Sequence, residues 1–211
     1  MKVVAINGSP RKDGNTSVLI NTVFKELEGQ GIKTKEINVG AKLIRGCIAC
    51  MKCFDNQDGH CAQKKDPVND WLDEMREADG IILGSPVYHA GLSGQLKVFI
   101  DRTAMVAIAN GDMFQRKAGA AVAAVRRAGA AATTSFLNTY FTSAQMMLVG
   151  SSYWNVGYGM DKKEVLKDGE GLQTMQNLGK NMAWLIKSIK ASKDQVAEPE
   201  TTMDVATNFI R

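Results

Sequence analysis

Four cysteines supply the most concentrated chemistry in the sequence. They are all the cysteines of the 211-residue chain, and they follow the spacing Cys47-x2-Cys50-x2-Cys53-x7-Cys61. A secreted disulfide scaffold spreads its cysteines to close long loops, which this compact group does not do. Thiolates this close can converge on one cluster, and four is the number that a 4Fe–4S cluster binds. A tetrahedral zinc site, or a disulfide formed on oxidation, would use the same residues.

A second candidate site is the loop of residues 8–17, which follows a short apolar run and precedes a helical pattern. Backbone N–H groups and the helix dipole favour an anion at such a position, and Gly14 lets the backbone come close to it. Neither the Gly-x-Gly-x-x-Gly pattern nor the Gly-x-x-x-x-Gly-Lys-Ser/Thr pattern is present. The loop therefore predicts a phosphate site of another type. The side chains expected to bind the phosphate are Ser9, Arg11, Asn15, Thr16 and Ser17.

The elements that must position these residues alternate along the chain. Apolar runs predict strands at 2–7, 33–38, 80–84, 118–125 and 146–150. Helical spacing predicts helices at 16–30, from 66 onward, at 92–103, at 131–145 and at 171–190. This alternation indicates one α/β domain over residues 1–190, with a doubly wound parallel sheet and helices on both faces. Residues 191–211 are polar with little periodicity and are expected to form an arm or a disordered tail.

The sheet type predicts where a ligand binds. In open parallel sheets ligands lie outside the carboxyl ends of the strands, at the topological switch point. Three loops are therefore expected to meet there: 8–17 after the first strand, 85–91 after the third and 125–130 after the fourth.

Composition limits the function classes. The chain is 45% hydrophobic and 23% charged, which is ordinary for a globular domain, and its net charge of +4 is spread out. Nucleic-acid binding is therefore not implied, whereas a weak positive field suits a phosphorylated small molecule. No stretch approaches the roughly 20 apolar residues of a membrane span, and the N-terminus does not resemble a secretory signal. We expect a cytoplasmic protein.

Two motifs carry a family resemblance. Asn7-Gly8-Ser9-Pro10-Arg11 with Gly14-Asn15-Thr16 resembles the phosphate loop of the NADPH-dependent FMN reductase and iron–sulfur flavoprotein families. Ser85-Pro86-Val87-Tyr88, followed by the segment 91–102, resembles their second signature. The resemblance runs from residue 2 to about residue 190. It implies a flavodoxin-like five-stranded sheet of order 2-1-3-4-5, with FMN as the phosphorylated ligand.

The resemblance also assigns residues to the flavin ring. It implies that the loop after the third strand runs along the ring, where backbone N–H groups tune the flavin potential. His89 departs from the glycine or aromatic residue usual in the family. The loop after the fourth strand is expected to reach the same edge, where an arginine would stabilise negative charge on reduced flavin near N1 and O2. The residues assigned to the two loops are Pro86, Val87, Tyr88, His89, Gly91, Arg126 and Gly129.

Three functions fit these features. The first is an FMN-dependent oxidoreductase that takes electrons from NAD(P)H and passes them to a small acceptor such as a flavin or a quinone, with no catalytic side chain required. The alternative is an iron–sulfur flavoprotein whose cysteine motif holds a 4Fe–4S cluster and takes electrons from ferredoxin. A redox sensor that uses only the cysteines ranks last, because it leaves the flavin loops unexplained. The exposed aromatic pair expected at Tyr153-Trp154 suggests a homodimer or homotetramer.

Overall fold

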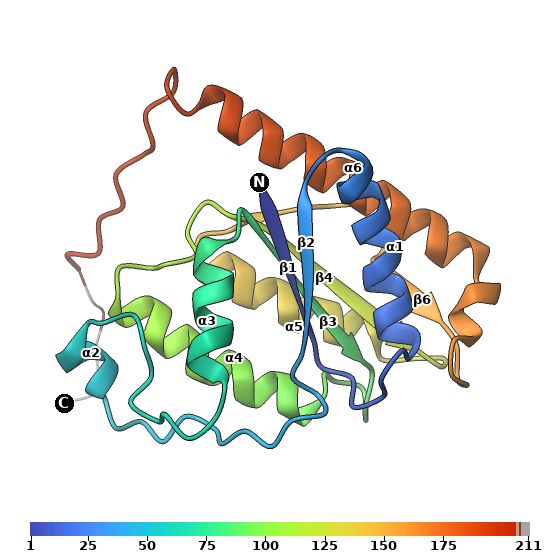
Figure 1. Cartoon of the computed structure of the whole chain (residues 1–211), viewed down its shortest axis with the longest axis horizontal. Coiled ribbons are helices and arrows are strands. Elements are labelled where there is room, and N and C mark those ends of the chain that lie inside the picture. The colour runs from blue at the N-terminus through green and yellow to red at the C-terminus, as the bar shows by residue number, and fades with distance from the viewer. Residues whose placement is uncertain (206, 208–211) are drawn as a thin grey trace.

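A parallel sheet forms the centre of the molecule (Figure 1). The computed structural model describes residues 1–205 and 207. The strands follow the order β2-β1-β3-β4-β5, which confirms the predicted flavodoxin-like order. The four longer strands are β1 (Lys2–Asn7), β2 (Lys33–Asn38), β3 (Gly80–Pro86) and β4 (Ala118–Val125).

The fifth position of the sheet differs from the single strand expected at 146–150. Two short strands share it, β5 (Met147–Leu148) and β6 (Val156–Tyr158). The first pairs with the start of β4 and the second with its end. The chain leaves the sheet between them because Ser151 Oγ donates to the carbonyl of Tyr153 and to the side chain of Asn155, at 2.6 and 2.7 Å, which closes a turn.

Alternation along the strands divides the core between two faces. Val4 and Ile6 of β1 pack toward α3 (Val68–Glu77), α4 (Gly94–Ala109) and α5 (Ala130–Ser143). Val3 and Ala5 pack on the opposite face, toward α1 (Asn15–Gly29) and α6 (Gly169–Ser192). Both faces of β1 are covered, which is why its residues 3–6 are apolar and buried. The short helix η1 (Glu164–Lys167) leads into α6.

Helix α4 is longer than the predicted 92–103. Ser93 caps it by accepting a hydrogen bond from the backbone N–H of Leu96, at 3.4 Å. The helix then continues to Ala109 through the segment 104–109, which is rich in alanine and therefore favours helix. The extension lies beside the cysteine segment, which contains only the short helix α2 (Lys52–Asn56).

The chain turns back after α6 and contacts the body of the molecule again. Arg116 forms an ion pair with Glu198 at 3.3 Å and also donates to the carbonyl of Pro199. Thr201 donates to the side chain of Gln145 at 3.0 Å. In the part described, residues 193–205 therefore form an arm; residues 206 and 208–211 of the predicted tail lie outside the described residues.

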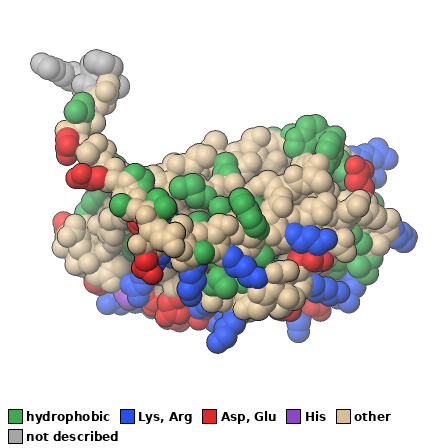
Figure 2. Space-filling model, turned by 90° about the horizontal axis from the view of Figure 1, so that it is seen from above, with side chains coloured by type: hydrophobic (Ala, Val, Ile, Leu, Met, Phe, Trp, Pro, Cys, Tyr) green, Lys and Arg blue, Asp and Glu red, His purple; other side chains and the backbone are tan. Residues whose placement is uncertain are grey.

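The spread of charged side chains over the surface and the hydropathy of the helices agree with the composition. On the face shown in Figure 2, basic and acidic side chains are interspersed with hydrophobic ones. None of the helices in the described residues combines the length and the hydropathy required to cross a bilayer.

We predict that Gly179→Ala destabilises the crossing of α1 and α6. A Cβ at Gly179 would lie 2.8 Å from the carbonyl oxygen of Val23 and 2.7 Å from Cβ of Glu26, so the two helices must separate. Overpacking of this kind costs about 1–3 kcal/mol, which exceeds the gain of about 1 kcal/mol in helix propensity. Urea unfolding measures the loss.

Gly29→Ala is the matched control, because Gly29 lies in the other helix and a Cβ there meets nothing within 4 Å. It should leave stability unchanged or raise it slightly. Equal midpoints for the two variants would contradict the predicted close approach.

Candidate functional site

A cleft opens at the carboxyl ends of β1, β3 and β4. It brings together residues from all three predicted loops and from the segment after β6. The residues that line it are Ser9, Arg11, Asn15, Thr16, Pro86, Val87, Tyr88, Ala124, Arg126, Gly159 and Met160. Gly159 and Met160 were not predicted to line the cleft, because the strand that precedes them, β6, was not predicted.

The first loop and the first turn of α1 contribute residues to this cleft. Helix α1 begins after Gly14 with no side-chain cap and no acidic residue in its first turn. The Oδ1 atom of Asn15 accepts a hydrogen bond from the backbone N–H of Val165 at 3.3 Å, which leaves its amide nitrogen as the donor on the side of Gly159. Thr16 is buried at the base of the cleft. The start of α1 is thus arranged to receive an anion.

The end of β2 supports the loop from behind. Glu36 accepts hydrogen bonds from Asn7 Nδ2 at 2.7 Å and from Ser17 Oγ at 2.9 Å. Asn7 Oδ1 in turn accepts the backbone N–H of Ser9 at 2.8 Å. The Ser17 hydroxyl is therefore committed to Glu36, which differs from its predicted role as a phosphate donor.

A close backbone approach completes this support. Asn38 donates to the carbonyl of Ser9 at 3.0 Å. A Cβ at Gly40 would lie 2.3 Å from the carbonyl oxygen of Gly8, so only glycine fits there. Sequence reasoning missed these positions, although polar residues at the ends of apolar strands were an available signal.

The second loop is closed by its own backbone. The N–H and carbonyl groups of Tyr88 and Gly91 bond reciprocally, at 2.8 and 3.0 Å. Between them His89 and Ala90 adopt positive φ angles of 46° and 62°, which non-glycine residues rarely adopt. Pro86, Val87 and Tyr88 line the cleft, while His89 is exposed at the tip of the turn and, like Gly91, is not among the lining residues.

The third loop packs against the second. Gly129 has a φ of +90°, and a Cβ there would lie 2.7 Å from the Cα of Ala90. Its role in this structure is the contact between the two loops, whereas Arg126 lines the cleft. Arg11 faces the cleft from the opposite loop and donates to the carbonyl of Met160 at 3.3 Å. The guanidinium groups of Arg11 and Arg126 give the cleft a positive lining.

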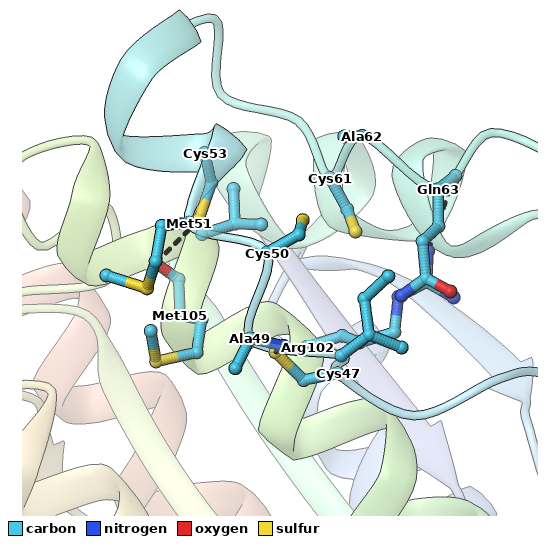
Figure 3. Close-up of a pocket in the computed structure, with 12 residues that line it drawn as sticks. Cys47, Ala49, Cys50, Met51, Cys53, Cys61, Ala62, Gln63, Arg102 and Met105 are labelled. Atoms are coloured by element: carbon cyan, nitrogen blue, oxygen red, sulfur yellow. Dashed lines mark hydrogen bonds between the residues drawn. The ribbon is translucent and has the colours of Figure 1, made fainter.

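A separate pocket is lined by all four cysteines (Figure 3). Cys47 and Cys50 are exposed, and Cys53 and Cys61 are half-buried. The thiols are free. In the part of the chain that the structure describes, no three His, Cys, Asp or Glu side chains are grouped closely enough to hold a single metal ion.

Arg102 of α4 holds both ends of the cysteine segment. Its side chain is fully buried. The Nη1 atom donates to the carbonyl of Arg45 at 3.1 Å and to the carboxylate of Asp66 at 2.5 Å, and Nη2 donates to the carbonyl of Gln63 at 2.9 Å. These acceptors flank the cysteines on both sides in the sequence. The Nε atom is buried without a hydrogen-bond partner.

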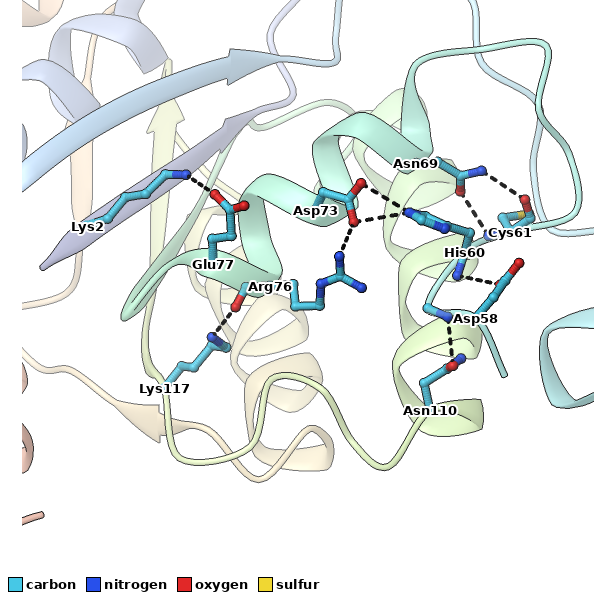
Figure 4. Close-up of polar contacts among 11 residues, drawn as sticks. Lys2, Asp58, His60, Cys61, Asn69, Asp73, Arg76, Glu77, Asn110 and Lys117 are labelled. Carbon is cyan, nitrogen blue, oxygen red and sulfur yellow. Dashed lines mark hydrogen bonds and ion pairs between the residues drawn. The ribbon is translucent and has the colours of Figure 1, made fainter. Parts of the chain in front are cut away.

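The last part of the segment is anchored to α3 and α4 (Figure 4). The His60 ring lies 3.1 Å from both carboxylate oxygens of Asp73, and Cys61 exchanges two backbone hydrogen bonds with the side chain of Asn69. The backbone N–H of Gly59 donates to Asn110 at 2.8 Å. These contacts fix Cys61 relative to α3 and to α4, the helix that carries Arg102.

We predict that iodoacetamide modifies Cys47 and Cys50 before Cys53 in the metal-free protein. Burial raises the pKa of the Cys53 thiol, and its Sγ lies 3.8 Å from the carbonyl of Met105, so both its thiolate fraction and its access are reduced. Mass spectrometry of time-quenched samples at pH 8 gives the order. Denatured protein, in which all four cysteines should react alike, is the control. Fastest modification at Cys53 would contradict the described pocket.

Comparisons with known proteins agree with this geometry. The model of the NADPH-dependent FMN reductase family matches residues 1–161. An iron–sulfur flavoprotein of Methanocaldococcus jannaschii is 39% identical over 197 residues, covering 90% of this chain and 100% of the relative. One from Archaeoglobus fulgidus is 31% identical, covering 89% and 81%. The flavodoxin-like WrbA-like protein of Agrobacterium tumefaciens has a similar fold, with a TM-score of 0.62 at 17% identity, covering 89% and 97%. The chain therefore belongs to the NADPH-dependent FMN reductase family, whose members include flavoprotein oxidoreductases.

Proposed function

We propose that the chain is an iron–sulfur flavoprotein that binds FMN in the cleft and a 4Fe–4S cluster in the cysteine pocket. The observation that carries this proposal is that all four cysteines line one pocket, in a segment that leaves β2 at the same end of the sheet as the cleft. FMN would exchange electrons singly or in pairs and the cluster singly. An external one-electron carrier such as a ferredoxin is the proposed partner.

The residues of the cleft fit the phosphate of FMN. The uncapped first turn of α1 and the hydroxyls of Ser9 and Thr16 offer hydrogen-bond donors. Arg11 contributes positive charge beside them. Val87 and Tyr88 offer an apolar and an aromatic surface of the kind that packs on a flavin ring. The proposed role of these residues is binding and orientation.

The residues of the cysteine pocket supply the ligands that a cluster needs. The ligands of one ion must converge on one point, whereas the four thiolates of a cubane bind different iron atoms and stay further apart. Four cysteines that line one pocket match the number of ligands that a 4Fe–4S cluster binds. The buried cation Arg102 lines the same pocket and complements the negative charge of thiolates.

A second candidate function is direct reduction of the flavin by NAD(P)H. The family match supports it. A nicotinamide would enter beside the exposed ring of Tyr88, on the side that faces the cleft. The acceptor would then be a small molecule such as a flavin or a quinone.

Self-association into a homodimer or homotetramer also belongs to the proposal, because Tyr153 and Trp154 are exposed aromatic side chains, 59% and 66% accessible.

We predict that Ser9→Ala combined with Thr16→Ala weakens FMN binding by at least about 100-fold. Each hydroxyl is proposed to donate to a charged phosphate, a hydrogen bond worth about 1.5–3 kcal/mol. Quenching of flavin fluorescence on titration with apoprotein gives the affinity.

Two comparisons make this test specific. Riboflavin, which lacks the phosphate, should bind the wild type and the double variant equally. Thr22→Ala is the matched control, because Thr22 lies on the same helix and its hydroxyl donates to the carbonyl of Val18, outside the cleft. A double variant with full FMN affinity would disprove the assignment of the phosphate loop.

We predict that Cys50→Ser removes iron and acid-labile sulfide but leaves FMN bound, because the proposed cluster ligand and the cleft residues lie in separate pockets. Metal and sulfide analysis of anaerobically reconstituted protein, with the visible spectrum, measures both groups. Met51→Leu is the control, because Met51 lines the same pocket without being a proposed ligand. Full iron content in Cys50→Ser would contradict the cluster.

Anaerobic addition of NADPH or NADH separates the two functions. Bleaching of the flavin band by the nicotinamide alone supports the reductase function. A flavin that is reduced only when a reduced one-electron carrier is added supports the electron-carrier function.

A further inference from the structure

Arg102 carries a buried hydrogen-bond donor that the fold leaves unused. The whole side chain is buried, and its Nη1 and Nη2 atoms make three hydrogen bonds to the two ends of the cysteine segment. Nε has no partner. A buried N–H that has lost its hydration without gaining an acceptor costs free energy, so such atoms call for a ligand or another explanation.

The pocket that Arg102 lines indicates the kind of acceptor. In the described part of the chain, its other lining residues are the four cysteines, small or apolar side chains, and Gln63, and Arg102 is the only charged residue among them. Figure 3 places Arg102 among the cysteines of the pocket. Sulfur atoms are therefore the acceptors that a group bound to these cysteines would bring into the pocket, and a cluster with four thiolates carries net negative charge.

We propose, on the basis of the function proposed above, that Arg102 is a positioning residue for the iron–sulfur cluster, and that its Nε–H donates to a sulfur of the bound cluster or of a cysteine ligand. Its Nη atoms hold the cysteine segment in place, and the remaining donor stabilises added negative charge. Hydrogen bonds to cluster sulfurs raise the reduction potential, because they favour the more negative, reduced state.

The test compares two variants that loosen the same segment in different ways. Arg102→Lys keeps the positive charge but removes Nε. Gln63→Leu removes the hydrogen bond from Gln63 Nε2 to the carbonyl of Gly46, 3.0 Å in length, and leaves Arg102 and its carbonyl acceptor on Gln63 intact. Both proteins are reconstituted anaerobically with iron and sulfide. Iron, sulfide and FMN contents are measured before the cluster potential is determined by a dye-mediated titration followed by electron paramagnetic resonance.

We expect the cluster of Arg102→Lys to have a lower midpoint potential than the wild type at matched iron content, and that of Gln63→Leu to stay close to the wild type. An unchanged potential in Arg102→Lys, or an equal decrease in both variants, overturns the proposal. A wild type that takes up no iron and sulfide disproves the cluster itself, and the proposal with it. A wild type with a cluster and an unchanged Arg102→Lys potential disproves the role of Arg102 alone.

A measurement on the unaltered protein covers the case in which Arg102→Lys does not fold. Protein labelled with ¹⁵N at the ε position of its arginines is reduced, and pulsed electron paramagnetic resonance records nuclei coupled to the cluster. Among the residues that the structure describes, Arg102 is the only arginine that lines the pocket. We expect a ¹⁵N coupling of the size found for nitrogen atoms that donate to cluster sulfur. Its absence in a fully loaded sample overturns the proposal.

Discussion

Parallel pairing of the strands is the constraint on which both sites depend. Because β1, β3 and β4 run in the same direction, the loops that follow them open at the same end of the sheet, although they are far apart in the sequence. The same constraint brings the end of β2 beside the first loop, where Gly40 and Gly8 meet backbone to backbone. The position of the cleft therefore follows from the topology of the sheet, and its side chains determine which ligand it binds.

Helix α4 connects the two sites. At its first turn, Ser93 donates to the carbonyl of Gly8 at 2.7 Å and accepts a hydrogen bond from the N–H of Leu96 at 3.4 Å, so one hydroxyl both caps the helix and holds the first loop. Further along the same helix, Arg102 holds the cysteine segment. A rigid helix thus fixes the cysteine pocket relative to the cleft, which electron transfer between two bound groups would require.

The sequence predicted the parts of the site that depend on residues close together in the sequence. Ser9, Thr16 and Pro86 lie in loops whose position follows from the alternation of strand and helix, and each lines the cleft. Glu36 was not predicted, because its partners Asn7 and Ser17 are separated from it by 29 and 19 residues. The division of the fifth strand was also missed, because the return of the chain to the sheet as β6 depends on a turn closed by the Ser151 side chain.

The burial of Arg102 is a feature that the helical pattern of α4 could have predicted. Helix α4 has a buried stripe that includes Phe99, Thr103 and Val106, and Arg102 is buried beside it. A cation at a buried helix position must be paired, because an isolated charge in the interior is far too costly. The pairing here is with Asp66 and with two backbone carbonyls, all contributed by the segment that carries the cysteines. Helix α4 could not bury the positive charge of Arg102 without partners. The partners come from the cysteine segment, and their bonds to Arg102 therefore tie that segment to the fold.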